Sequence, residues 1–293
     1  MIEVKNLSKI YSNGKGIFEL DFKVSEGEAF GFLGPNGSGK TTTIRNLLGF
    51  TNPTSGSCSI NGLDCRTNAA EIQEILGYVP GEISFFDNMT GMQFMKFIAD
   101  MRGIDDTSRR DSLIERFELE SDRKIRRMSK GMKQKVGLIT AFMHDPSVII
   151  LDEPTSGLDP LMQRCFIELI IEEKQRGKTI FMSSHMFDEI DRTCERAAII
   201  REGKIAAIKD ISSLKSTLRK SYIVSVASNS DMDKIKASIL DYEVIDDNKV
   251  EIFISNNYDD MLTTLASCKV TSLDVSAQTL EQIFIQYYGK EED

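Results

Sequence analysis

The chain has 293 residues, of which 41% are hydrophobic and 28% are charged, a composition that excludes disordered and collagen-like chains. Its net charge of −9 disfavours nucleic acid as the main partner. The acidity is uneven, because residues 216–293 hold 7 basic and 14 acidic side chains, whereas residues 1–215 hold 29 and 31. This asymmetry indicates a separate unit at the C-terminal end.

The cysteine and histidine content argues against a zinc centre. The five cysteines are odd in number and lack Cys-x-x-Cys spacing, and the chain has only two histidines. Reduced, mostly buried thiols in a cytosolic protein are the preferred interpretation. No apolar run approaches the ~18–20 residues that a membrane helix needs, and the N-terminus has no signal-peptide layout.

Short strands alternate with helices through the first 215 residues. Glu28–Leu33 is expected to form a buried strand that runs into a Gly-rich loop and then a helix from Thr41 to about Gly49. Such alternation predicts an α/β domain over residues 1–215, with a mostly parallel sheet covered on both faces. Further helices are expected at 93–101, 108–117 and 132–143, within an inserted helical subdomain at about 83–143. Strands are expected at 148–151, 179–183 and 197–200, with helices at 160–175 and 186–194.

Residues 216–293 follow a different pattern and are expected to form a small accessory α+β domain. Their order of elements is β-α-β-β-α-β with one more helix at the end, and it resembles the ferredoxin-like supersecondary unit. The expected strands are 222–227, 242–245, 249–254 and 270–275, and the expected helices are 231–240, 259–267 and 279–288.

A phosphate-binding loop is the first motif that carries chemistry. The segment from Gly34 to Thr41 matches G-x-x-x-x-G-K-[ST] and lies between a predicted strand and a predicted helix. Glycines let backbone N–H groups converge on phosphate oxygens, and the helix N-terminus adds partial positive charge. The Lys40 ammonium is expected on the β- and γ-phosphates, with the Thr41 hydroxyl on Mg²⁺. The expected nucleotide contacts of this segment are Gly34, Pro35, Asn36, Gly37, Ser38, Gly39, Lys40, Thr41 and Thr42.

An acidic pair follows the apolar run Val148–Leu151. A continuous apolar run is typical of a parallel strand buried on both faces, and ligands of open α/β sheets bind at the carboxyl ends of strands. Asp152 is therefore expected to hold Mg²⁺, through water. Glu153 is expected to act as the general base that polarises the attacking water.

Together these motifs resemble the ATP-binding subunit of an ATP-binding-cassette (ABC) transporter, which is a P-loop NTPase. Met128–Gln134 lies at the position of the family signature, and Ser156–Asp159 matches the family's D-loop. His185 matches the switch histidine, and Tyr11 matches the aromatic residue that stacks on adenine. Six motifs occur in the family's order between residue 1 and about residue 215.

The resemblance implies a hydrolase that binds ATP and Mg²⁺ in a head-to-tail dimer. Ser129 and Gly131 of one subunit would contact the ATP held by the other, with Asp159 also in the nucleotide set. Glu153, His185 and Lys40 would be the catalytic residues. Closure and opening of the pair, expected to be a homodimer, would drive polytopic membrane subunits on a separate chain. The subunit would lie in the cytoplasm, peripheral at the inner face of the cell membrane.

Two positions depart from the family pattern. Lys130 stands where the signature usually has glycine, and Glu82 stands where the Q-loop usually has glutamine. Glu82 is expected to reach Mg²⁺ or its water. Both departures resemble a subfamily of bacterial exporters for drugs and antimicrobial peptides, whose C-terminal Ser/Thr-Leu-Glu-x-x-Phe pattern matches Thr279–Phe284.

Alternative interpretations stay open at several positions. Ser129 could cap the helix that follows it, Tyr11 could be a core aromatic residue, and His185 could be an ordinary buried histidine. The methionines and phenylalanines of residues 89–101 are interpreted as the core of the helical subdomain, or else as a groove for a membrane partner's helix. A soluble ABC ATPase acting on ribosomes or DNA and a nucleotide-gated regulatory module are the competing functions.

Overall fold

The computed structural model describes residues 1–216, 220–254 and 257–277. The chain divides into two compact units, Met1–Ile211 and Ser212–Asp293. This division lies close to residue 215, where the change of sequence pattern was expected. In the described part of the chain no helix is long and apolar enough to cross a membrane.

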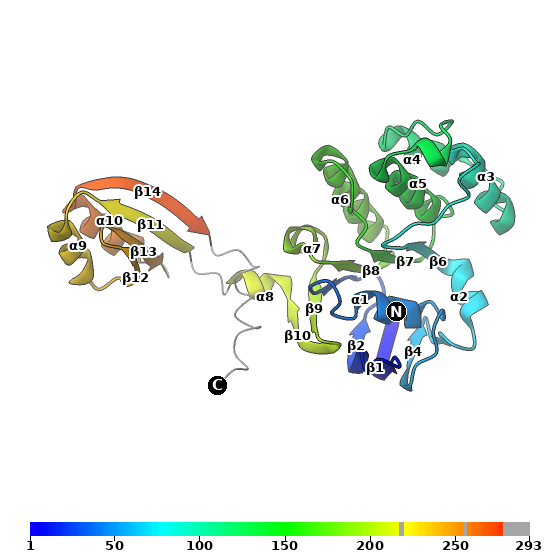
Figure 1. Ribbon diagram of the computed structural model, residues 1–293, viewed down its shortest axis with the longest axis horizontal. Helices are drawn as coiled ribbons and strands as arrows, with labels where there is room; N and C mark the ends of the chain where they lie inside the picture. Colours follow the sequence, from blue (N-terminus) through cyan, green and yellow to red (C-terminus); the bar gives the residue numbers. More distant parts are fainter. Residues whose placement is uncertain (217–219, 255–256, 278–293) are drawn as a thin grey trace. The chain divides into compact units, whose positions relative to one another are not determined.

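A six-stranded sheet forms the centre of the N-terminal unit and confirms the predicted α/β class (Figure 1). The strands β3, β6, β7, β8 and β9 are parallel to their neighbours, and only β10 is antiparallel. Buried apolar runs fill the middle strands, as expected for a parallel sheet covered on both faces. In sheet order the strands are β10 (Lys204–Asp210), β9 (Arg196–Arg201), β3 (Ala29–Leu33), β8 (Thr179–Ser184), β7 (Val148–Asp152) and β6 (Leu76–Val79).

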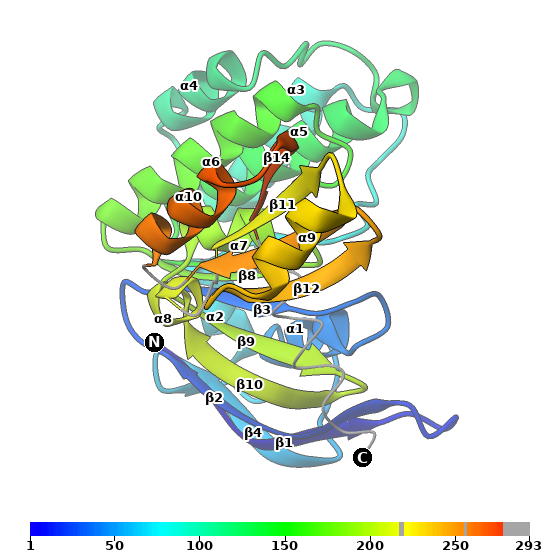
Figure 2. The ribbon, with the colours of Figure 1, turned by 90° about the vertical axis from the view of Figure 1, so that its left-hand side faces the viewer.

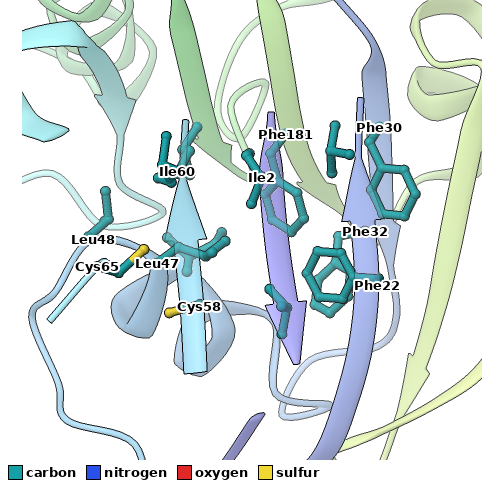
Figure 3. Close-up of a cluster of buried hydrophobic side chains, with 14 of the residues drawn as sticks. Ile2, Phe22, Phe30, Phe32, Leu47, Leu48, Cys58, Ile60, Cys65 and Phe181 are labelled. Atoms are coloured by element: carbon teal, nitrogen blue, oxygen red, sulfur yellow. The ribbon is translucent and has the colours of Figure 1, made fainter. Parts of the chain in front are cut away.

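A second, antiparallel sheet lies on one side of the central sheet, and the helices α3 to α6 lie on the other (Figure 2). A cluster of buried side chains from both sheets and from α1 (Lys40–Leu47) fills the space between the two sheets (Figure 3). The rings of Phe22 and Phe30 stack at 5.7 Å, and Phe32 packs on Phe181 at 5.3 Å. The strands of the second sheet, in order, are β2 (Gly16–Val24), β1 (Ile2–Ile10), β4 (Ser55–Ile60) and β5 (Leu63–Asp64).

The helices of the N-terminal unit begin at recognisable capping residues. Thr90 and Gln93 form a reciprocal capping box at the start of α3, and Ser129 caps α5. Asp159 caps α6, which has Pro160 at its first position. The helices are α2 (Ala69–Ile75), α3 (Gly91–Arg102), α4 (Ser108–Arg116), α5 (Lys130–Phe142), α6 (Pro160–Gln175) and α7 (Phe187–Thr193), with a 3-10 turn at Ile125–Arg127.

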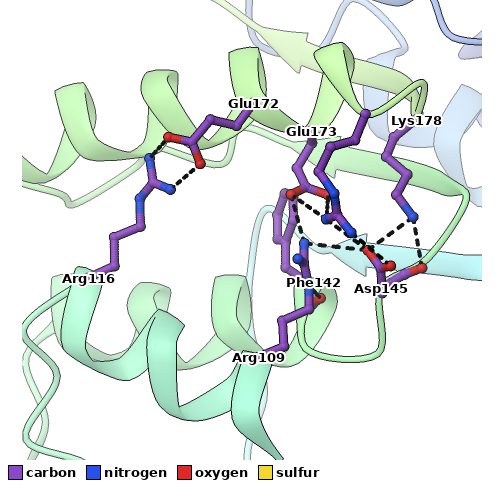
Figure 4. A network of polar contacts seen from close by, with 8 residues as sticks. Arg109, Arg116, Phe142, Asp145, Glu172, Glu173 and Lys178 are labelled. Atoms are coloured by element: carbon purple, nitrogen blue, oxygen red, sulfur yellow. Dashed lines mark hydrogen bonds and ion pairs between the residues drawn. The ribbon is translucent and has the colours of Figure 1, made fainter.

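Ion pairs anchor helix α4 to helix α6 (Figure 4). The Arg116 guanidinium donates to both carboxylate oxygens of Glu172, which lowers the pKa of that carboxyl. Arg109 pairs with Glu173 at 2.7 Å and donates from Nε to the carbonyl oxygen of Phe142 in α5. Because Glu173 is only 2% exposed, its ion pair is shielded from water and fixes the helical subdomain on α6.

The C-terminal unit is built on a four-stranded antiparallel sheet in the order β12-β13-β11-β14. Each β-α-β connection is split by one antiparallel strand, which is the ferredoxin-like arrangement. A separate core forms between the sheet and its two helices, around Val224, Ile252, Met232 and Met261. The elements are α8 (Ile211–Ser216), β11 (Lys220–Val226), α9 (Asn229–Lys236), β12 (Asp241–Asp246), β13 (Lys249–Ile254), α10 (Tyr258–Ala266) and β14 (Val270–Ala277).

Helix α9 begins and ends earlier than the expected 231–240, because Ser228 caps it and accepts from the backbone N–H of Asp231. The helix expected at 279–288 and the Thr279–Phe284 pattern lie outside the described residues.

Candidate nucleotide site

The phosphate loop connects β3 to α1, and its shape requires glycine at two positions. Gly39, which precedes the helix, has φ +112°, a conformation that other residues rarely adopt. A Cβ at Gly34 would lie 2.4 Å from the carbonyl oxygen of Ile200 on the neighbouring strand. The backbone N–H of Gly203 donates to the Ser38 carbonyl at 2.9 Å and fixes the loop from the other side. The loop is therefore held by the tertiary structure around it.

Lys40 and Thr41 emerge from the start of α1 and meet the acidic end of β7. The Lys40 ammonium donates to the carbonyl oxygens of Gly34 at 2.7 Å and Pro35 at 3.1 Å. It also forms an ion pair with Glu153 at 3.2 Å, although Lys40 is only 5% exposed. The loop and the acidic strand end thus form one site.

The Asp152 carboxylate occupies the centre of this site and is 2% exposed. Its Oδ2 accepts from the Thr41 hydroxyl at 2.8 Å, and its Oδ1 accepts from the Ser183 hydroxyl on β8. A hydroxyl and a carboxylate in contact are the oxygen ligands that Mg²⁺ takes, alongside phosphate and water. The residue types at Thr41 and Asp152 therefore fit the expected metal.

Glu153 has the left-handed backbone conformation, with φ +48°, which is uncommon outside glycine. Its backbone N–H donates to the Ser183 carbonyl at 3.1 Å. One carboxylate oxygen contacts Lys40, and the other lies 3.1 Å from Nδ1 of His185. Two side chains expected to be catalytic, Lys40 and His185, therefore contact the third, Glu153, from separate segments of the chain. His185 is half exposed, so the interpretation as an ordinary buried histidine does not fit it.

Tyr11 lies beside the phosphate loop, at one edge of a cavity of about 200 Å³. Its ring is 36% exposed and sits on a turn closed by a bond from its own N–H to the Lys15 carbonyl. This exposure argues against a core aromatic residue and leaves a ring face beside the loop. The cavity is lined by Tyr11, Lys15, Gly16, Asn36, Gly37, Gly39, Lys40, Thr41, Thr42 and Glu153.

The segment after β6 passes along the acidic strand end. A Cβ at Gly81 would lie 3.4 Å from Oδ2 of Asp152. Glu82 follows immediately, with an exposed side chain that is not part of the cavity lining. The expected metal contact of Glu82 stays a prediction that rests on its position in the chain.

The signature segment packs against the D-loop of its own chain. Ser129 is a helix cap whose Oγ accepts from the Met132 N–H at 3.2 Å, which confirms the alternative interpretation of Ser129 as a capping residue. Lys130 donates to the Ser156 hydroxyl at 2.8 Å, and a Cβ at Gly131 would lie 2.5 Å from the Gly157 carbonyl.

Most of the expected phosphate-loop contacts line the cavity, and Gly34, Pro35 and Ser38 belong to the same loop without lining it. The expected contacts outside the loop, Ser129, Gly131 and Asp159, do not line the cavity either. Asp159 instead caps α6, and the backbone N–H groups of Leu161 and Met162 lower the pKa of its carboxyl. The structure therefore brings the phosphate-loop and acidic residues together and leaves the signature residues apart from them.

Some residues of the site were not predicted from the sequence. Ser183 bonds Asp152, and Gln134 donates from its buried amide to the Pro154 carbonyl at 2.7 Å. Glu189 in α7 accepts from the hydroxyls of Thr155 and Ser184. Only the Ser183-Ser184-His185 sequence pointed to any of them, because the rest are long-range contacts that no local pattern reveals.

Comparison with known proteins is consistent with this geometry. Residues 17–156 match the ABC transporter family. The chain is 34% identical to the bacitracin transport ATP-binding protein BcrA of Bacillus licheniformis, over 99% of this chain and 97% of that protein. It is 28% identical to the linearmycin resistance ATP-binding protein LnrL of Bacillus subtilis, over 99% of each.

Solved structures share the fold of the N-terminal unit. The ATP-binding subunit of an ABC transporter superposes with a TM-score of 0.69 at 30% identity, over 73% of this chain and 92% of that one. A dimeric bacterial ABC transporter cassette superposes with a TM-score of 0.66 at 23% identity, over 72% of this chain and 99% of that one.

Proposed function

The chain belongs to the ABC transporter ATP-binding family, and from this premise we propose that it powers an exporter built with separate membrane subunits. As a member of the family it is an ATPase that binds ATP with Mg²⁺ and works as a dimer beside membrane subunits. The relatives named for bacitracin transport and linearmycin resistance support export of antimicrobial compounds as the transport task.

The division of the site into two parts is the observation that carries the proposal. Lys40, Thr41 and Asp152 meet at one place in the chain, whereas Ser129 and Gly131 lie outside that cavity. A second copy, placed head to tail, would bring its signature residues to the open side of the phosphate loop. Because this chain carries both parts, a homodimer completes two equal sites.

The contacts support a separate role for each residue of the phosphate-loop part. The Lys40 ammonium and the loop N–H groups bind the phosphates, and Tyr11 offers its ring to the base. Thr41 and Asp152 would hold Mg²⁺, and the metal would supply positive charge beside the phosphates. Glu153 accepts the proton of the attacking water, and His185 orients the Glu153 carboxylate.

A groove of mixed polar and apolar lining beside the helical subdomain is the proposed contact with the membrane partner. The groove, about 760 Å³, lies between α2 and the helices α3 and α5. Met101 lines it and is 70% exposed, while Phe86 and Phe97 expose their rings nearby on the same subdomain. Flexible methionine and aromatic side chains are typical of surfaces that accept an amphipathic helix. A membrane partner on this groove would hold the chain at the inner face of the cell membrane.

Turnover and assembly test the proposal. The purified chain should hydrolyse ATP slowly, lose turnover when Mg²⁺ is chelated, and form an ATP-dependent dimer when Glu153 is replaced by Gln. Co-expression with its polytopic membrane partner should yield a complex and raise turnover. A monomer that persists with ATP in Glu153→Gln would contradict the dimer, and stable binding to ribosomes or DNA instead of a membrane protein would contradict the transport role.

A further inference from the structure

A buried carboxylate lies between the two loops that carry the candidate catalytic residues. Glu189, on α7, is 4% exposed. Its Oε1 accepts from the Thr155 hydroxyl, and its Oε2 accepts from the Ser184 hydroxyl at 2.8 Å. Thr155 follows Glu153 closely in the chain, and Ser184 directly precedes His185. We call these three residues, Thr155, Ser184 and Glu189, the Glu189 clamp.

No ion pair compensates the burial of the Glu189 carboxylate in the described part of the chain. Its side-chain contacts in the described part of the chain are the two hydroxyls, and no cation pairs with it there. Burial of a carboxylate is unfavourable unless each oxygen is hydrogen-bonded, and an apolar residue would fill the same space without that cost. The clamp therefore joins two loops at the expense of stability.

Helix α7, which carries Glu189, packs tightly against the central sheet. Ile190, the next residue, is fully buried against β3, where a Cβ at Gly31 would lie 2.4 Å from its Cγ2 atom. This close approach fixes the distance between α7 and the central sheet. The position of the Glu189 carboxylate is thus set by the central sheet and does not depend on either loop.

The two hydroxyl partners connect onward to the site. Ser184 accepts from the Met186 N–H at 2.9 Å through its hydroxyl and from the Gly34 N–H at 3.3 Å through its carbonyl. On the other side, the Ser156 N–H donates to the Glu153 carbonyl at 3.1 Å, which closes a turn that contains Thr155. Movement of Glu189 would therefore move both ends of the Glu153–His185 contact.

We propose that Glu189 is a positioning residue, which holds the loops of Glu153 and His185 in register through Thr155 and Ser184. It does not touch nucleotide and acts only through these two loops. The proposal rests on the proposed role of Glu153 as the general base. Small displacements of a catalytic group are costly, with about 100-fold lost for a misplacement of about 1 Å.

The variants at position 189 have a predicted order. Glu189→Ala removes both bonds and should lower kcat about 10- to 100-fold, with ATP affinity unchanged within about twofold. Glu189→Gln should keep most of the activity, because the amide can accept from one hydroxyl and donate to the other. Rescue by the amide distinguishes a hydrogen-bonded clamp from a requirement for charge.

Glu173→Ala is the matched control, since Glu173 is equally buried but pairs with Arg109 away from the phosphate loop. This variant should lower the melting temperature and leave kcat within about twofold of the parent. The full chain is used throughout, with ATP binding, steady-state hydrolysis and melting temperature measured on each variant. A kcat loss confined to the position 189 series supports the clamp.

Two further variants keep the test decisive if Glu189→Ala does not fold. Thr155→Val and Ser184→Ala each remove one arm, and each should lower kcat while ATP affinity is retained. Unchanged kcat in both, or a parallel loss of ATP affinity, would overturn the clamp. Glu153→Gln is measured beside these variants. If Glu153→Gln retains full turnover, the assignment of Glu153 as the general base is wrong. If Glu153→Gln loses turnover and the clamp variants do not, only the clamp proposal is wrong.

Discussion

The phosphate-loop half of the site and the signature half differ in how much the folded chain completes alone. In the first half, Lys40 and Asp152 are buried, and they bond to Gly34 of the phosphate loop and to Thr41 of α1, respectively. In the second half, Ser129 and Lys130 are exposed and contact only their own helix and D-loop. The difference supports the proposal that the single folded chain arranges the phosphate-loop half, whereas the signature half is completed by a second subunit.

The topology of the sheet causes this difference. The loops after β3, β7 and β8 leave the carboxyl ends of adjacent parallel strands, so they meet at one edge. The signature segment begins helix α5 of the inserted subdomain, and its Lys130 and Gly131 contact Ser156 and Gly157 of the D-loop. Variants in the two halves should therefore fail in different ways.

Glu153→Gln should give the largest effect, a fall in kcat of about 10²- to 10⁴-fold, because the amide cannot accept a proton from water. ATP binding should persist, since the Lys40 contacts with the loop carbonyls are untouched. Phosphate release and nucleotide titration measure the two quantities on one sample. Turnover near that of the parent would remove Glu153 from the role of base.

Gly131→Ala should separate the two halves. The added Cβ would meet the Gly157 carbonyl at 2.5 Å and push the signature away from the D-loop. We expect hydrolysis to fall about 10- to 100-fold and the ATP-dependent dimer to weaken, with monomer ATP affinity unchanged. Size-exclusion chromatography in the Glu153→Gln background reports the dimer. A loss of ATP affinity in the monomer would contradict the separation of the site into two halves.

Lys130→Ala should have a smaller effect. It removes an exposed hydrogen bond to Ser156, and such bonds contribute about 0.5–1.5 kcal/mol. Hydrolysis should fall about two- to fivefold in the dimer, with no change in melting temperature. Lys133→Ala, on the same helix and partly exposed, is the control and should match the parent. Equal effects of the two substitutions on hydrolysis would show that Lys130 contributes only as a surface charge.

Removal of residues 216–293 should have the least effect on nucleotide binding. The N-terminal unit has its own core, and none of the residues that line its nucleotide cavity comes from the C-terminal unit. The truncated chain should fold and bind ATP within about twofold of the full chain, as calorimetric titration would measure. A large loss of affinity would show that the acidic unit contributes to the site.

The amino-acid sequence alone was sufficient to predict the local features of this protein. The phosphate loop, the acidic strand end and the Ser129 cap are short segments whose residue types encode their own geometry, whereas the capping role of Asp159 was not predicted. Helix α6 occupies the residues predicted for it, since Asp159 and Pro160 mark its start. The parallel sheet followed from buried apolar runs alternating with helices.

Only the tertiary structure decided which side chains meet across the fold. The pairing of β1 with β4, the Lys130–Ser156 bond and the Glu189 clamp join positions far apart in the chain. A periodic pattern reports which face of an element is buried, but it does not report which distant hydroxyl a buried carboxylate will find. Thus the sequence predicted the residues expected to contact nucleotide, and the folded chain determined which other side chains hold them in place.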